Sequence, residues 1–237
     1  MSFDKYYRLN LEETKKKIKE SVQFDDFIAQ SVNNISETAK AANTLVKRLR
    51  EWYELYNPEF SREIADNEIF VSLLLNGKDT KKNGSMGADL DEKDYEPILR
   101  LAKDSNTLFA LKHKQEEYLE RLMLKHCPNM TAVAGYLVGA KLIALAGKMK
   151  RLIMFPASTV QLLGAEKALF RHMKTGSRSP KHGIIHEHPL ISRVGAKDKG
   201  KAARILADKI LIAAKIDYFK GKFIGDELRK EAEARFL

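Results

Sequence analysis

Basic side chains recur at helical spacing in the second half of the sequence. Four of them follow one another at steps of about four residues: Lys167, Arg171, Lys174 and Arg178. The first three therefore share one face of a predicted helix. Residues 148–181 carry eight basic side chains and only one acidic side chain. A stripe of this kind suits the phosphate backbone of a nucleic acid, whose charges it neutralises. The alternative interpretation is a helix face that only meets solvent.

The predicted helix that carries this stripe runs from Ser158 to about Lys174. A capping box formed by Ser158 and Gln161 opens the helix, and Gly176 can end it in the left-handed conformation. The loop that follows adds Lys181, and its glycine-containing backbone can supply further hydrogen-bond donors at little steric cost. The apolar residues of this segment are expected to face the core: Leu162, Leu169, Phe170 and Met173.

Other groups in this region could in principle do chemistry. His182, His186 and His188 lie close together, but only Glu187 is near enough in sequence to help them hold a metal ion. Polar contact with RNA or a partner is the preferred interpretation, because neutral histidine both donates and accepts. Glu166 could serve a stand-alone RNA-processing enzyme, although neutralising its basic neighbours explains it equally well. The phosphate-binding, nucleophile and metalloprotease motifs are absent, so we expect no catalytic residues, no metal and no cofactor.

The net charge of +10 is concentrated at the C-terminal end of the chain. Residues 1–94 carry a net charge of −3, residues 95–127 of +1 and residues 128–237 of +12. Such asymmetry favours a polyanionic partner for the last segment, either nucleic acid or an anionic membrane. A membrane would require a continuous apolar face beside the basic one, which the sequence lacks. The single cysteine and the absence of a signal-like N-terminus predict a soluble intracellular protein.

The first half predicts two long helices. From Ile28 to Tyr56 small or apolar residues alternate at steps of four and three, which is typical of a coiled-coil seam, and Pro58 closes the helix. A similar run covers residues 98–126, and the connection contains a short helix and an exposed tip at residues 76–87. The two helices predict an antiparallel hairpin, which is either a spacer or a dimerisation arm. The proposed dimerisation seam is Ile35, Ala39, Ala42, Val46, Leu49 and Leu108.

The second half also predicts helices only. Cys127 and Pro128 mark a boundary, after which small residues favour closely packed helices. A long helix is expected over residues 198–219, capped by Gly221, and Asp226 can cap a last one. No alternating strand pattern persists anywhere, so the fold class is all-α. The predicted divisions are residues 1–24, 25–127 and 128–237.

Several sequence blocks resemble the Nop domain family. The sequence GAEKALFRHMKTG, preceded by FPASTVQLL and followed by SRSPKHGIIHEHPLI, is similar to the signature of that family. Further blocks are GAKLIALAGKMKRL, the segment from residue 201 to residue 231, and RLREWYELYNPEF and GSMGADL in the hairpin. The resemblance covers residues 25–237 and is most marked for archaeal members.

The resemblance implies a coiled-coil hairpin that homodimerises, followed by a compact helical Nop domain. It implies a non-catalytic scaffold of box C/D guide ribonucleoproteins, which direct ribose 2′-O-methylation. In the family, the Nop domain recognises a kink-turn RNA together with the small ribosomal-type protein bound to it, and the scaffold holds the methyltransferase fibrillarin. By this resemblance, the residues that face RNA or the small protein are Glu166, Lys167, Arg171, His172, Lys174, Lys181 and His182.

Two features depart from the family pattern. Family members usually begin with a domain that binds fibrillarin, and residues 1–24 are too short to replace it. A second candidate function is therefore a reduced or spliceosomal-type Nop paralogue that binds an RNP without recruiting fibrillarin. Eukaryotic relatives often carry histidine four residues after the loop glycine, where this sequence has Glu187. The expected location is the cytoplasm for an archaeal protein and the nucleolus or nucleus for a eukaryotic one.

Overall fold

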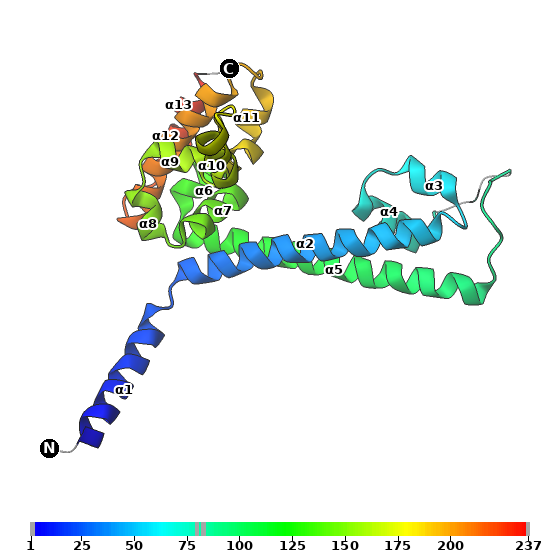
Figure 1. Cartoon of the computed structure of the whole chain (residues 1–237), viewed down its shortest axis with the longest axis horizontal. Helices are drawn as coiled ribbons and strands as arrows, with labels where there is room; N and C mark the ends of the chain where they lie inside the picture. The colour runs from blue at the N-terminus through cyan, green and yellow to red at the C-terminus, as the bar shows by residue number, and fades with distance from the viewer. Residues whose placement is uncertain (1–2, 79–80, 82–83, 236–237) are drawn as a thin grey trace. The chain divides into compact units, whose positions relative to one another are not determined.

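The computed structural model describes residues 3–78, 81 and 84–235, and every regular element in those ranges is a helix (Figure 1). Most of them are α-helices, and one short 3-10 helix, η1 (Ile184–Glu187), interrupts the second half. The all-α prediction is confirmed. The predicted tip at residues 76–87 falls partly outside the described residues, at positions 79–80 and 82–83.

The chain forms two compact units. Unit 1 joins Met1–Val32 to Tyr118–Leu237, and unit 2 is Asn33–Glu117. The sequence predicted boundaries at residues 24 and 127. The units divide elsewhere because the helices α2 (Phe24–Tyr53) and α5 (Glu92–His126) each run from one unit into the other.

Unit 2 is built on α2 and α5, which run side by side in opposite directions in Figure 1. Two short helices, α3 (Pro58–Glu63) and α4 (Asn67–Leu75), connect them. The first long helix ends at Tyr53, earlier than predicted, and Asn57 then caps α3 by accepting a hydrogen bond from the backbone N–H of Phe60 at 3.2 Å. Pro58 therefore opens a new helix rather than merely closing the old one.

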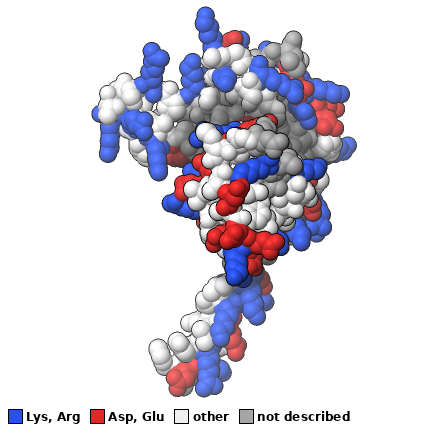
Figure 2. Space-filling model, turned by 90° about the vertical axis from the view of Figure 1, so that its right-hand side faces the viewer, with Lys and Arg blue, Asp and Glu red and all other residues white. Residues whose placement is uncertain are grey.

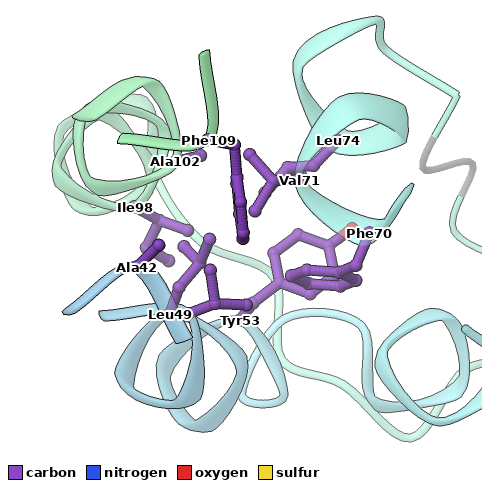
Figure 3. Packing of buried hydrophobic residues seen from close by; sticks show 10 residues of the cluster. Ala42, Leu49, Tyr53, Phe70, Val71, Leu74, Ile98, Ala102 and Phe109 are labelled. Carbon is purple, nitrogen blue, oxygen red and sulfur yellow. The ribbon is translucent and has the colours of Figure 1, made fainter. Parts of the chain in front are cut away.

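A cluster of buried side chains from α2, α4 and α5 forms the core of unit 2 (Figure 3). The rings of Tyr53 and Phe70 meet edge to face, with centroids 5.5 Å apart. The predicted seam is buried within this single chain at Ile35, Ala42, Val46 and Leu49, and partly buried at Ala39 and Leu108. On α5 the buried positions include Ala102 and Phe109, and Phe109 is one residue beyond Leu108 of the predicted seam. The shift arises because α4 adds a third surface to what was treated as a two-helix interface.

The C-terminal part of unit 1 is a bundle of short helices around α12 (Lys199–Tyr218). The helices before α12 are α6 (Pro128–Ala134), α7 (Tyr136–Ala146), α8 (Met149–Met154), α9 (Ala157–Leu162), α10 (Glu166–Thr175) and α11 (Pro189–Arg193). The last helix is α13 (Gly225–Glu233). Small side chains of α12, including Ala202, Ala203 and Ala207, are fully buried, which lets α6, α8, α9 and α13 pack closely against it.

The ends of the last two helices differ in detail from the sequence prediction. Lys220, with φ of +54°, takes the left-handed position after α12 that was expected of Gly221. Gly221 instead donates its N–H to the carbonyl of Ile216 at 2.8 Å. Asp226 lies in the first turn of α13 but forms no side-chain capping bond there.

The prediction of one continuous helix over residues 158–174 is wrong, because the structure has two helices there, α9 and α10. Gly164 turns the chain at φ of +87°, a conformation that suits glycine. The carbonyl groups of Gln161 and Leu163 accept hydrogen bonds from the backbone N–H groups of Gly183 and Ile184, both at 2.7 Å. These carbonyls are therefore paired with a later loop and do not continue the helix. The predicted capping box is also absent, since Pro156 precedes α9 and no side chain caps it.

The N-terminal helix of unit 1, α1 (Phe3–Ser21), has no buried residue. Within the described ranges, no single helix is long and apolar enough to cross a membrane. Only α6 and α7 taken together pass that test, and the chain bends by 112° between them. Both helices contribute to the core of the bundle, for example through Met130 and Leu142.

Candidate nucleic-acid interface

The corner between α9 and α10 places the predicted site residues at the start of an exposed helix. The carboxylate of Glu166 accepts a hydrogen bond from the backbone N–H of Gly164 at 2.7 Å. This bond closes the corner from within the chain. Glu166 thus has a structural role at the first position of α10, where its negative charge also suits the helix dipole.

The cationic stripe lies along α10. Lys167, Arg171 and Lys174 are all exposed, and none of them has an ion-pair partner among the residues that the structure describes. Arg178, in the loop after α10, is exposed and unpaired in the same sense. Their spacing predicted a shared helix face, and the structure places them on the surface. These cations are free to meet an anionic ligand.

Two apolar side chains stand beside the stripe, where the sequence interpretation was wrong. Phe170 and Met173 were expected in the core, but they are 60% and 70% exposed, and α10 buries no residue at all. The signal was present in the spacing. Phe170 is three residues after Lys167 and four before Lys174, and residues so spaced are neighbours on a helix surface.

The end of α10 is tied to the loop by His172. Its Nδ1 is hydrogen-bonded to the carbonyl oxygen of Ser177, so the ring N–H donates. Gly176 ends the helix in the left-handed conformation, with φ of +68°, as predicted. His172 therefore orients the start of the loop while remaining only partly buried.

The loop is pinned to α9 through Gln161, a positioning residue that sequence reasoning assigned to a capping box instead. The side-chain amide of Gln161 donates to the carbonyl of Lys181 at 2.6 Å. Gly183 lies so close to α9 that a Cβ on it would stand 1.9 Å from the carbonyl oxygen of Leu163. These contacts fix the backbone on either side of His182, leaving the Lys181 side chain exposed.

The three histidines of the loop have separate surroundings. The rings of His182 and His186 stack, with centroids 5.8 Å apart. The pKa of His182 is lowered, mainly by partial burial and to a smaller extent by the nearby His186. His188 accepts a hydrogen bond from the backbone N–H of Leu190 at 3.2 Å and so caps α11. Burial lowers the pKa of His188 as well. Glu187, between the last two, pairs with Lys141 at 2.6 Å.

Charged side chains are unevenly distributed over the visible face in Figure 2. Lys and Arg project along the upper left and upper edge of that view with uncharged residues between them, while Asp and Glu form groups near the middle and at the upper right. Independently of that view, the helix α10 and the loop of Arg178, Lys181 and His182 combine unpaired cations with exposed apolar groups, on a backbone held by Gln161 and His172. This interface could contact a nucleic acid and a protein at once.

The sequence matches the Nop family, described as "snoRNA binding domain, fibrillarin", over residues 34–237. An uncharacterised NOP5 family protein of Methanocaldococcus jannaschii is 40% identical over 255 aligned residues, which cover 98% of this chain and 61% of the relative. Nucleolar protein 56 of Schizosaccharomyces pombe is 36% identical, with 89% of this chain and 48% of the relative covered. The chain thus spans about half to three fifths of the length of these curated relatives.

A solved structure supports the same relationship. The crystal structure of a fibrillarin/Nop5p complex contains a chain that matches this one with a TM-score of 0.60 at 28% identity. The match covers 99% of this chain and 79% of the solved chain. Since the family match extends over most of the sequence and includes the whole of α10 and its loop, this chain belongs to the Nop family.

Proposed function

We propose that the chain is a non-catalytic scaffold that recognises RNA and an RNA-bound protein together through α10 and the loop that follows it. The observation that carries this proposal is the composition of one exposed helix. Lys167, Arg171 and Lys174 have no ion-pair partner among the described residues, and Phe170 and Met173 stand beside them in solvent. Exposed apolar side chains grouped beside unpaired cations are typical of an interaction surface.

The cations suit the RNA part of the ligand. Each phosphate contact made by a lysine or arginine releases a counterion, so several such contacts add affinity that depends strongly on salt. Arg178 and Lys181 extend the row of positive charge into the loop, which Gln161 holds in place. We propose that these residues follow the backbone of a kink-turn RNA of the box C/D class.

The apolar groups suit a protein. Exposed aromatic and methionine side chains are enriched where proteins meet each other, and charged residues surround such contacts. Phe170 and Met173 would meet the small ribosomal-type protein already bound to the kink-turn. Recognition would combine the two kinds of contact, so the RNA and the protein together would bind more tightly than either alone.

The relatives favour a place for this scaffold in RNA methylation. A Nop5p chain has been solved in complex with fibrillarin, and the eukaryotic relatives are named as nucleolar proteins. By analogy, the chain would hold fibrillarin in a guide RNP that directs ribose 2′-O-methylation.

The chain would also form a homodimer. Because the predicted seam is buried in its own hairpin, the second copy would pack on the outer face of unit 2, where Ile69 and Leu111 are exposed.

The test is a gel shift with a box C/D kink-turn RNA, with and without the small kink-turn protein. The chain should bind the preformed RNA–protein complex more tightly than it binds either component alone. Lys167→Glu should weaken this ternary complex by roughly tenfold or more, since it removes one phosphate contact and adds repulsion. The matched control is Lys93→Glu, the same charge reversal at an exposed lysine of unit 2.

Both variants should keep the circular dichroism spectrum of the parent chain. Equal weakening by the two substitutions would reduce the effect to net charge and remove α10 from the interface. Equal affinity of the chain for the kink-turn RNA with and without the small protein would overturn composite recognition.

A further inference from the structure

The turn after α12 combines exposed aromatic rings with unpaired cations. Phe219 is 73% exposed and Phe223 is 54% exposed, although phenylalanine is usually buried. Lys220 and Lys222 lie between them in the sequence FKGKF, and both are exposed. Neither lysine has an ion-pair partner among the described residues.

The backbone of this turn is fixed at both ends. Gly221 donates to the carbonyl of Ile216 at 2.8 Å, and a Cβ at Gly221 would stand 2.9 Å from a methyl carbon of Ile216. Ile224 donates to the side-chain oxygen of Asn129 at 2.7 Å. The backbone between and beside the two exposed rings is therefore held by hydrogen bonds.

Lys220 shows an unusual conformation inside this turn. It is the one non-glycine residue with positive φ in the described part of the chain, at +54°. Glycine commonly takes this position after a helix, because a side chain there is strained. The turn thus carries a lysine where the fold alone would favour a glycine.

The neighbouring acidic group does not neutralise the lysines. Asp217 is held at the end of α12, where its two oxygens accept hydrogen bonds from Asn129 and from the backbone N–H of Met130. The next acidic side chains, at residues 226 and 227, come after the turn, in the first turn of α13. The local charge of the turn is therefore positive.

We propose that the turn Phe219–Phe223 is a second RNA contact of this chain, one that takes unpaired bases. Single-stranded RNA is held by aromatic rings on which bases stack, combined with cations that meet the phosphates. Phe219 and Phe223 supply two rings, and Lys220 and Lys222 supply the cations. Because the turn is already rigid, little ordering is lost when a strand binds.

This contact lies at the far end of α12 from the α10 interface. The loop of that interface meets the start of α12, where Gln161 donates to the carbonyl of Gly200 at 3.4 Å. The helix has 20 residues and is therefore roughly 30 Å long. The two contacts are independent, and the second needs no kink-turn protein and does not rest on the proposed scaffold function.

The test is fluorescence anisotropy with a labelled oligouridine RNA of about 12 nucleotides, a length within the range of single-strand sites. Changing Phe219 and Phe223 together to alanine should weaken binding by about tenfold or more, because a base that loses its stacking partner loses much of its contact. A duplex RNA of the same length should bind both proteins equally, since its bases are already paired. Phe27→Ala removes a ring of similar exposure, 51%, elsewhere in unit 1 and should change neither affinity.

Lys220→Gly separates binding from folding. It removes one cation and relieves the strained position, so the thermal midpoint should not fall while RNA affinity does. The slope of log affinity against log salt should decrease by about 0.7, the value for one phosphate contact on a single strand. Lys167→Glu should leave the oligouridine affinity unchanged, because α10 is a separate site. Unchanged oligouridine affinity in the double phenylalanine variant would overturn the proposal and leave the turn to a protein partner.

Discussion

Two regions of the molecule bring a cation and an aromatic ring together, and they treat both groups in opposite ways. In unit 2 the guanidinium of Arg50 lies 4.2 Å above the ring of Phe70, which is fully buried. On α10 of unit 1, Lys167 and Lys174 are three and four residues from Phe170, which is 60% exposed. The kinds of group are the same. The difference lies in whether the chain itself satisfies them.

Arg50 uses its fork of donors completely within unit 2. It donates to the side chain of Asn67 at 2.9 Å and to the carbonyl oxygens of Ser61 and Ile64 at 2.6 and 2.8 Å. Burial lowers the pKa of Arg50, although the group stays charged, and these bonds offset the cost of removing that charge from water. The cations of α10 have no such partners. A cation that its own chain satisfies supports the fold, whereas one left unsatisfied on a rigid helix is available to a ligand.

The largest expected effect is the loss of stability when the buried ring of Phe70 is removed from unit 2. Phe70→Ala should lower the free energy of unfolding of unit 2 by about 3 to 5 kcal/mol, because it leaves a cavity under Arg50 and against Tyr53. Urea unfolding followed by circular dichroism measures the change. Leu55, which is 60% exposed in the same unit, is the control, and Leu55→Ala should cost less than about 1 kcal/mol. Equal losses for the two variants would mean that burial does not separate their roles.

The opposite result, lost binding with little lost stability, is expected for Phe170→Ala combined with Met173→Ala on α10. Since both side chains are exposed, the free energy of unfolding should change by no more than about 0.5 kcal/mol. Assembly on the RNA–protein complex should weaken by about tenfold, the effect of about 1.4 kcal/mol lost from an apolar contact. Gel-shift titration measures it. Loss of stability without loss of assembly would place these residues with Phe70 instead.

Much of this contrast could be read from the sequence. The alternation of steps predicted the long helices and buried Ala42, Val46 and Leu49, because a helix period fixes which residues share a face. The same geometry predicted that Lys167, Arg171 and Lys174 stand together. These features depend on residues within a few turns of each other, which local patterning determines.

The parts that failed depend on contacts between distant segments. The corner at Gly164 exists because the N–H groups of Gly183 and Ile184, some twenty residues later, take the carbonyls of α9. Phe109 replaced Leu108 as the buried residue because α4 covers that side of α5. Phe170 was misplaced for a different reason. Its apolar character outweighed its position beside Lys167, and no local rule says which apolar residue the fold leaves for a partner.

A third titratable cation, His113, is intermediate between these two cases, and its substitution gives the smallest predicted effect. His113 on α5 is hydrogen-bonded to Glu68 on α4 at 2.5 Å and to Glu116 at 3.3 Å, and its side chain is 49% exposed. The bond to Glu68 raises the pKa of His113 above its ordinary value of 6.5, while Lys112 and partial burial oppose the rise. His113 is thus partly satisfied by its own chain and partly in water.

Because the folded pKa is raised, the charged pair stabilises unit 2 fully below pH 6.5, the unfolded value. This contribution is lost as the pH rises through the folded pKa. His113→Gln should therefore cost about 0.5 kcal/mol at acidic pH, a typical value for an exposed pair, and almost nothing at alkaline pH. A double-mutant cycle with Glu68→Gln, measured by urea unfolding across this range, isolates the pair. A coupling energy that does not vary with pH would show that the contact is an ordinary neutral hydrogen bond. A coupling energy that disappears at high pH would show that the chain satisfies His113 only while the ring is charged. His113 would then be intermediate in role between Arg50, which the chain satisfies, and the cations of α10, which it does not.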